Sequence, residues 1–358
     1  MVRIVTFFVV WLSFSLYAAA QQNVTIQVQL GGQRVEGTPL AWSSSRVHLL
    51  LRDGRIWDFS PTDAKGFQQV SSSFRSYTQS DMRGQLLTEF GRRFEVSGTG
   101  QFLVVHPVGL RDKWARRFEE LYRSFRHYFT VRGLRPQTPP FPFVAVVFHD
   151  QVEFLKYSAS QGVNVDRGVL GYYSPKTNRV LIYDQDVGSG GDNQWQKNGA
   201  IIIHEASHQS AFNTGIHNRF APPPRWVAEG LGTMFEARGV WDSRNHASQS
   251  DRINRGWFEN FTRHQVTNRR KGSLAELISS DRTFQTNPTA AYAQSWALTF
   301  YLAEREPQKY FQYLAKTGQR EAFTPYRSTE RLADFTSVFG SNLDMLDTRL
   351  VRFMQQLK

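Results

Sequence analysis

The sequence predicts an α+β fold, and three observations support this prediction. Residues 23–30, NVTIQVQL, alternate between polar and apolar, which is the period of a half-buried strand. An amphipathic helical pattern over 111–132 is followed by prolines and by the strand pattern FVAVVFHD. From Gln194 onward almost every pattern is helical. With 358 residues, 40% apolar and 21% charged, the chain is globular and long enough for two or three compact units.

The first 20 residues have the layout of a secretory signal peptide. One arginine precedes the apolar run 4–16, which ends at three alanines, so we expect cleavage after Ala20. The alternative is an uncleaved anchor, but the run is short against the roughly 20 residues that a membrane span needs. No other segment is apolar enough to span, so no transmembrane anchor is expected after cleavage. The chain has no cysteine and cannot use disulfides, which fits a periplasmic or secreted bacterial protein.

Residues 21–80 predict a small β module. Asp53-Gly54 lies between two apolar runs, as in a hairpin, and the pattern resembles an SH3-like barrel. The serine-rich stretch 66–80 is expected to form a loop or linker.

Residues 81–240 predict a mixed unit of strands and helices. Two strands are expected within 85–107, one of them containing LLTEF, and the helix 111–132 follows. Next come the strand FVAVVFHD, a helix over 151–160 and the hairpin GVLGYYSPKTNRVLIYD. Residues 241–358 predict a helical C-terminal subdomain whose last helix, in DMLDTRLVRFMQQL, has the apolar spacing of a packed helix.

The net charge of +12 identifies no nucleic-acid site. The densest basic groups, 111–135 and 252–271, are interleaved with other residues, and the first carries a core-facing apolar stripe. No recognition motif accompanies the charge, so we expect no nucleic-acid partner. An anionic cell-envelope polymer stays open as a partner.

The stretch GAIIIHEASHQS, 199–210, carries the strongest functional signal. His204 and His208 are one helical turn apart on one face, and both imidazoles can therefore reach one Zn²⁺. Glu205 stands beside the first ligand, where it can hold a polarised water. The alternative is a surface helix with two solvated histidines. A catalytic zinc needs a third protein ligand, and Glu229, on a helix started by the prolines 222–224, can fold back to it.

HEASH followed by RWVAEGLGTMFE resembles the gluzincin zinc peptidases of clan MA (HExxH…E). The flanking patterns GYYSPKTNRVLIYD and AYAQSWALTFYL resemble an uncharacterised bacterial branch of that superfamily, and the resemblance covers about 141–302. The resemblance implies a zincin-like mixed sheet with an active-site helix. It also implies one zinc ion per chain on His204, His208 and Glu229, with Glu205 as general base. The implied activity is that of a zinc metallopeptidase acting on a peptide or protein substrate.

The sequence departs from the family pattern at two positions. Ala228 and Thr233 stand where other gluzincins often carry asparagine and an acidic residue that support the ligands. Glu236 either takes over that support or faces solvent.

Two further elements of a peptidase site have candidates. Tyr292 is the first choice for stabilising an oxyanion, against the alternative of a packed core tyrosine, with His217 and His264 as further choices. Residues 169–173 are the candidate edge strand for pairing with a substrate backbone, against the alternative of an ordinary strand of the core sheet.

Besides a metal-free adhesin or scaffold, two other functions remain open at this stage. One is a catalytically weak or inactive protein that carries zinc and binds envelope material through the β module. The other is a cell-wall amide hydrolase that acts on an anionic polymer.

Overall fold

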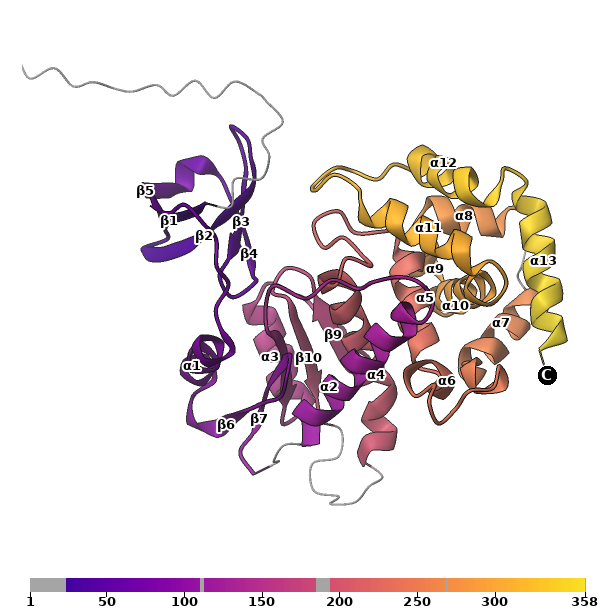
Figure 1. The fold of residues 1–358 in the computed structure, drawn as a ribbon, viewed down its shortest axis with the longest axis horizontal. Helices are drawn as coiled ribbons and strands as arrows, with labels where there is room; N and C mark the ends of the chain where they lie inside the picture. Colours follow the sequence, from indigo (N-terminus) through magenta and orange to yellow (C-terminus); the bar gives the residue numbers. More distant parts are fainter. Residues whose placement is uncertain (1–23, 110–112, 185–193, 268–269, 358) are drawn as a thin grey trace, which may run out of the picture. The chain divides into compact units, whose positions relative to one another are not determined.

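The computed structural model describes residues 24–109, 113–184, 194–267 and 270–357. The predicted signal peptide, 1–20, lies outside these residues. The α+β fold class is confirmed, with a β-sheet unit first and helices last (Figure 1). Within the described part of the chain, no helix combines the length and apolar character needed to cross a membrane. The chain divides into two compact units, described separately below. The predicted domain limits at 80/81 and 240/241 stay predictions.

The first unit comprises the described residues 24–52 and 57–75. Its sheet has the order β4-β3-β2-β1-β5. The strands are β1 (Thr25–Leu30), β2 (Gln33–Trp42), β3 (Val47–Leu51), β4 (Ile56–Phe59) and β5 (Ala64–Ser71), with a short 3-10 turn at Pro61–Asp63. The alternation read in β1 is real, because Ile26, Val28 and Leu30 are buried in its core.

The predicted loop over 66–80 is wrong in its first part. Residues up to Ser71 belong to β5, which pairs antiparallel with β1. Nearly every residue of β5 is exposed, and even Phe67 is 59% exposed. A strand that buries no face has no apolar alternation, so its sequence looks like a loop.

The second unit is built on a mixed five-stranded sheet. Its strands are β6 (Phe94–Gly98), β7 (Phe102–Pro107), β8 (Phe143–Phe148), β9 (Gly171–Ser174) and β10 (Arg179–Tyr183), in the order β6-β7-β8-β10-β9. The three central strands are parallel, and both outer strands pair antiparallel. The predicted hairpin therefore forms, with β9 at an edge of the sheet.

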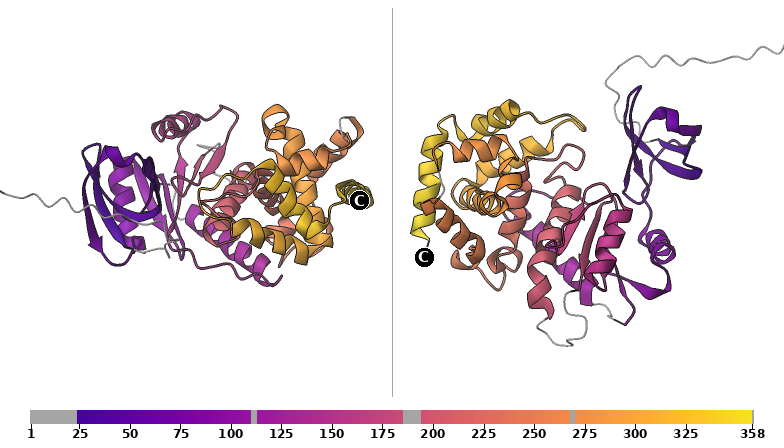
Figure 2. Two further views of the ribbon diagram at one scale, coloured as in Figure 1. Left: turned by 90° about the horizontal axis from the view of Figure 1, so that it is seen from above. Right: turned by 180° about the vertical axis from the view of Figure 1, so that it is seen from behind.

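Helices cover both faces of this sheet (Figures 1 and 2). One face carries α1 (Gln79–Phe90) and α3 (Gln151–Ser160), and the other carries α2 (Lys113–Thr130) and α4 (Gln194–Asn213). Neighbouring residues of β7 serve opposite faces: Phe102 lies in the α2/α4 core and Leu103 in the α1/α3 core. Both faces of the sheet are thus buried, which holds α4 in a fixed position.

The predicted strand at LLTEF is wrong, because these residues form the end of α1. Thr78 accepts a hydrogen bond from the Asp81 backbone, and the Asp81 side chain bonds back to the Thr78 backbone. This capping box fixes the start of the helix and overrides the local apolar pattern.

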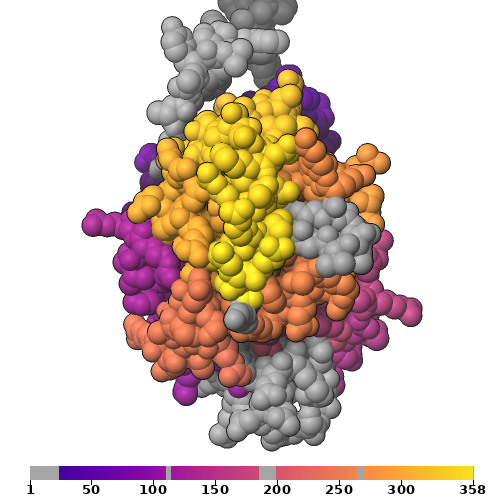
Figure 3. Space-filling view, turned by 90° about the vertical axis from the view of Figure 1, so that its right-hand side faces the viewer, coloured from indigo at the N-terminus to yellow at the C-terminus, as the bar shows by residue number. Residues whose placement is uncertain are grey.

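The remaining chain is helical. The helices are α5 (Arg225–Phe235), α6 (Arg238–Trp241), α7 (Arg255–Thr267), α8 (Ser273–Ser279), α9 (Thr283–Thr286), α10 (Pro288–Arg305), α11 (Pro307–Gly318), α12 (Ser328–Phe339) and α13 (Leu343–Gln356). Helix α10 is buried over most of its length. The last helix, α13, runs down the face seen in Figure 3 and packs on α10 through Phe353 and Phe300, as its apolar spacing predicted.

Candidate metal centre

Helix α4 presents the HEASH residues from a rigid base. Ile202 and Ile203 are buried in the core between α4 and the sheet, so the turn that follows them cannot rotate freely. His204 and His208 lie one turn apart, with ring centroids 4.6 Å from each other, and both are buried. The helical spacing read from the sequence therefore brings the two imidazoles to one face.

Helix α5 brings a carboxylate to the same place. Gly230 follows Glu229, and a Cβ atom at this glycine would lie only 2.6 Å from the Ser295 backbone oxygen and would overlap the Thr299 hydroxyl. The missing side chain allows the backbones of α5 and α10 to approach closely. This close contact fixes Glu229 opposite the two histidines.

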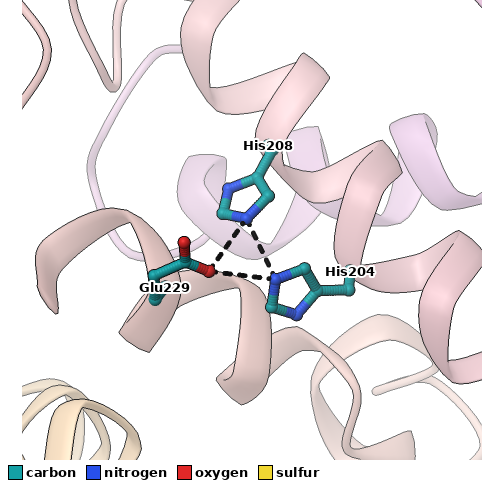
Figure 4. Close-up of side chains that lie close together, drawn as sticks. All are labelled: His204, His208 and Glu229. Carbon is teal, nitrogen blue, oxygen red and sulfur yellow. Dashed lines mark hydrogen bonds and ion pairs between the residues drawn. The ribbon is translucent and has the colours of Figure 1, made fainter. Parts of the chain in front are cut away.

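The three side chains converge on one point (Figure 4). Glu229 Oε2 lies 3.3 Å from His204 Nε2 and 3.4 Å from His208 Nε2, and the two Nε2 atoms are 3.0 Å apart. Donors in a tetrahedral zinc site, at about 2.0–2.1 Å from the ion, lie about 3.3 Å from one another. The separations match that value, and three protein donors leave one tetrahedral position for another ligand. The donor set of two imidazoles and one carboxylate thus fits a catalytic zinc.

The pKa shifts of His204 and Glu229 show that the electrostatics of the cluster favour positive charge. Burial alone lowers the pKa of His204, but the hydrogen bonds with Glu229 and Glu236 outweigh it and raise this pKa well above its ordinary value. Burial alone raises the pKa of Glu229, and the hydrogen bonds with His204 and His208 lower it well below its usual range. A carboxylate kept ionised in a buried site favours a cation beside it.

Glu236 supports the first histidine, which settles the alternative left open by the sequence. Its Oε1 accepts from His204 Nδ1 at 2.8 Å, and its Oε2 accepts from Asn254 Nδ2 at 2.7 Å and Trp257 Nε1 at 3.1 Å. These bonds fix the ring orientation and leave Nε2 facing His208 and Glu229. Sequence reasoning missed Asn254 and Trp257, because they come from α7 and its preceding turn and form no spaced motif with the histidines.

Glu205 belongs to a second stripe of α4, which faces the sheet. Its Oε2 accepts the backbone N–H of Tyr173, on the edge strand β9, at 2.7 Å. Four and eight residues later, Gln209 donates to the backbone oxygens of Val144 and Asn178, and Asn213 exchanges hydrogen bonds with the Asn178 amide. Glu205, the residue beside the candidate metal ligands, is therefore oriented by the strand. Burial raises the pKa of the Glu205 carboxyl, with the neighbouring histidines opposing that rise.

Tyr292 lies beside the site, as a residue that is to stabilise an oxyanion there must. Its ring is 6.5 Å from that of His204 and stacks on Trp257 with centroids 5.5 Å apart. Its hydroxyl lies within electrostatic reach of Arg225, a residue that sequence reasoning did not select. Burial raises the pKa of Tyr292, so its hydroxyl keeps the proton that it would donate.

The remaining sequence candidates have different surroundings. His217 is buried, and its Nδ1–H donates to the Ile216 carbonyl at 3.1 Å, while burial lowers its pKa to about 3. The side chain of His264 lies outside the described residues. The edge strand is β9, Gly171–Ser174, so it begins two residues later than the candidate stretch 169–173.

Part of the chain matches a family model, and its fold resembles solved zinc metallopeptidases at low sequence identity. A family model described as "Protein of unknown function (DUF1570)" matches residues 198–324, which contain all three donors. No curated protein matches the chain. An M1 zinc metallopeptidase from Deinococcus radiodurans is 14% identical, with a TM-score of 0.40, over 74% of this chain and 51% of that one. A two-domain M1 zinc metallopeptidase bound to L-arginine is 12% identical, with a TM-score of 0.40, over 73% of this chain and 51% of that one. The chain spans about half the length of these structures.

Proposed function

We propose that this chain is an exported zinc-dependent metallopeptidase of the gluzincin type that hydrolyses peptide bonds. The observation that carries the proposal is the convergence of His204, His208 and Glu229 at zinc-site separations. The carboxylate of Glu205, on the sheet-facing side of the same helix, adjoins them. The signal-like segment at 1–20 supports export to the periplasm or the medium.

His204, His208 and Glu229 would hold one zinc ion, and Glu236 would keep His204 in the ligating orientation. Zinc in such a site supplies a Lewis acid and lowers the pKa of its water toward about 7. Glu205 would accept the proton of the attacking water and then donate it to the leaving amine.

Tyr292 would donate its hydroxyl hydrogen bond to the oxyanion of the tetrahedral intermediate. The edge strand β9 supplies the backbone rim of the site, since its Tyr173 N–H already points at Glu205. A peptide that lies along this rim would be held by main-chain hydrogen bonds.

The test uses the mature protein, zinc analysis and unfolded casein. We expect one zinc per chain and casein cleavage that a chelator abolishes and added zinc restores. Glu205→Gln is expected to retain zinc and to lose hydrolysis. A Glu205→Gln protein that cleaves as fast as the wild type removes the general-base role. A wild-type protein with bound zinc that releases peptidoglycan fragments but leaves casein intact favours a cell-wall amide hydrolase instead.

A further inference from the structure

Arg225 lies next to the metal centre without belonging to its donor set. It is the first residue of α5, and its Nε donates to Glu229 Oε1 at 3.3 Å. The other oxygen of that carboxylate, Oε2, faces His204 and His208. One carboxyl group therefore separates the guanidinium from the place where the three donors meet.

The guanidinium is held in position before any ligand arrives. Its Nε is hydrogen-bonded to Glu229, and its Cζ lies 4.6 Å from the centre of the Phe284 ring. A planar guanidinium stacked in this way loses little freedom when it binds a carboxylate with two parallel hydrogen bonds. Five N–H donors are available on each arginine, and the Arg225 side chain remains 44% exposed, so it has donors to offer to an incoming group.

The acidic groups around Arg225 are already engaged. Asp281 accepts the Arg225 backbone N–H, but its carboxylate is paired with both terminal nitrogens of Arg331 at 2.9 and 3.0 Å. The side chains of Glu229 and Glu236 are only 15% and 17% exposed. Arg225 is therefore more exposed than Asp281, Arg331, Glu229 or Glu236, and its sign favours an anion over the ammonium group of a peptide.

We propose that Arg225 forms a subsite that binds a substrate carboxylate beside the bond to be cleaved. This inference rests on the proposed peptidase function and deepens it, because it names the substrate class. That class is peptides with a carboxylate close to the scissile bond, either the C-terminal α-carboxylate or an acidic side chain. Arg225 acts here as a specificity residue.

The test measures binding in a zinc-loaded Glu205→Gln background, so that it does not depend on turnover. Calorimetry compares three N-acetylated peptides: tri-alanine with a free C-terminus, its C-terminal amide, and an amide with aspartate as the last residue. We expect at least one carboxylate peptide to bind about 10- to 100-fold more tightly than the neutral amide, the size of a lost charge-assisted hydrogen-bond pair. Arg225→Gln is expected to abolish this preference.

The controls separate a binding role from a folding or metal role. Arg282→Gln removes the same charge from an exposed nearby position and should leave the preference intact. Zinc content and unfolding temperature are measured for each variant, and Arg225→Lys, which keeps the charge without the planar fork, should lose part of the preference. If only the peptide with a free C-terminus binds more tightly, the subsite takes the α-carboxylate. If only the aspartate peptide does, the subsite takes an acidic side chain.

Equal binding of acid and amide by the parent, or a preference that survives Arg225→Gln, overturns the inference. A wild-type protein that cleaves no peptide refutes the proposed function, while these binding ratios still decide the role of Arg225.

Discussion

Replacing Glu236 by glutamine tests whether this carboxylate holds the His204 ring in the orientation that a metal ion would need. All three groups that bond to Glu236 are donors: His204 Nδ1–H, the Asn254 amide and the Trp257 indole N–H. A glutamine has the same shape but only one acceptor oxygen, so at least one donor would face its NH₂ group. Loss of such a partner typically weakens metal binding 10- to 100-fold, which corresponds to about 1.4–2.7 kcal/mol.

The assay is a titration of zinc against a chelator of known affinity, performed on Glu236→Gln and on the wild type. Glu259→Gln serves as the control, since it removes one carboxylate from an exposed position on α7, the helix that carries Trp257. We expect the control to bind zinc like the wild type. If Glu236→Gln does so too, His204 does not depend on this carboxylate for its orientation, and the assignment of Glu236 is wrong.

Three further predictions concern single residues. Glu229→Ala should reduce the zinc content to well below one per chain by elemental analysis; an unchanged stoichiometry would exclude it as a ligand. Gly230→Ala places a methyl group against the Ser295 oxygen and should cost about 1–3 kcal/mol in denaturant unfolding while weakening zinc binding; unaltered unfolding would show that α5 can shift freely. Burial raises the pKa of Glu89, but the hydrogen bonds and charge of Arg179, the Tyr157 hydroxyl and the charge of Arg55 together lower it by more. This group of contacts therefore stabilises the fold above about pH 4.5 and less as the pH falls below that value. Glu89→Gln should therefore lose about 1–3 kcal/mol near neutral pH and show a flatter acid dependence of unfolding; parallel pH curves for both proteins would contradict this.

The spacing of the donors was accessible from the sequence because helices impose it. Positions four apart must share a face, and a glutamate early in the next helix needs only a short connection to return. The orientation of the Glu236 side chain could not be predicted, because it depends on where α5 ends and on two donors, one in α7 and one in the turn before it. Arg225 was overlooked although it stands four residues before Glu229, the spacing of an ion pair within one helix.

The errors in the first half of the chain have local causes. The helix start at Thr78 was visible as a threonine followed three residues later by Asp81, but the apolar run in LLTEF outweighed it. Strand β5 left no readable pattern, because alternation appears only where one face of a strand is buried. Patterns report burial, so exposed strands and short capped helices are the elements most easily misassigned.

The second stripe of α4 has a consequence for how such a protein can change over evolution. Glu205 and Gln209 attach the helix to main-chain atoms, the Tyr173 N–H and the Val144 and Asn178 carbonyls. Every amino acid except proline supplies the same N–H, and every one supplies the same carbonyl. Mutations can therefore accumulate along the outer strand β9 while helix α4 keeps its anchorage.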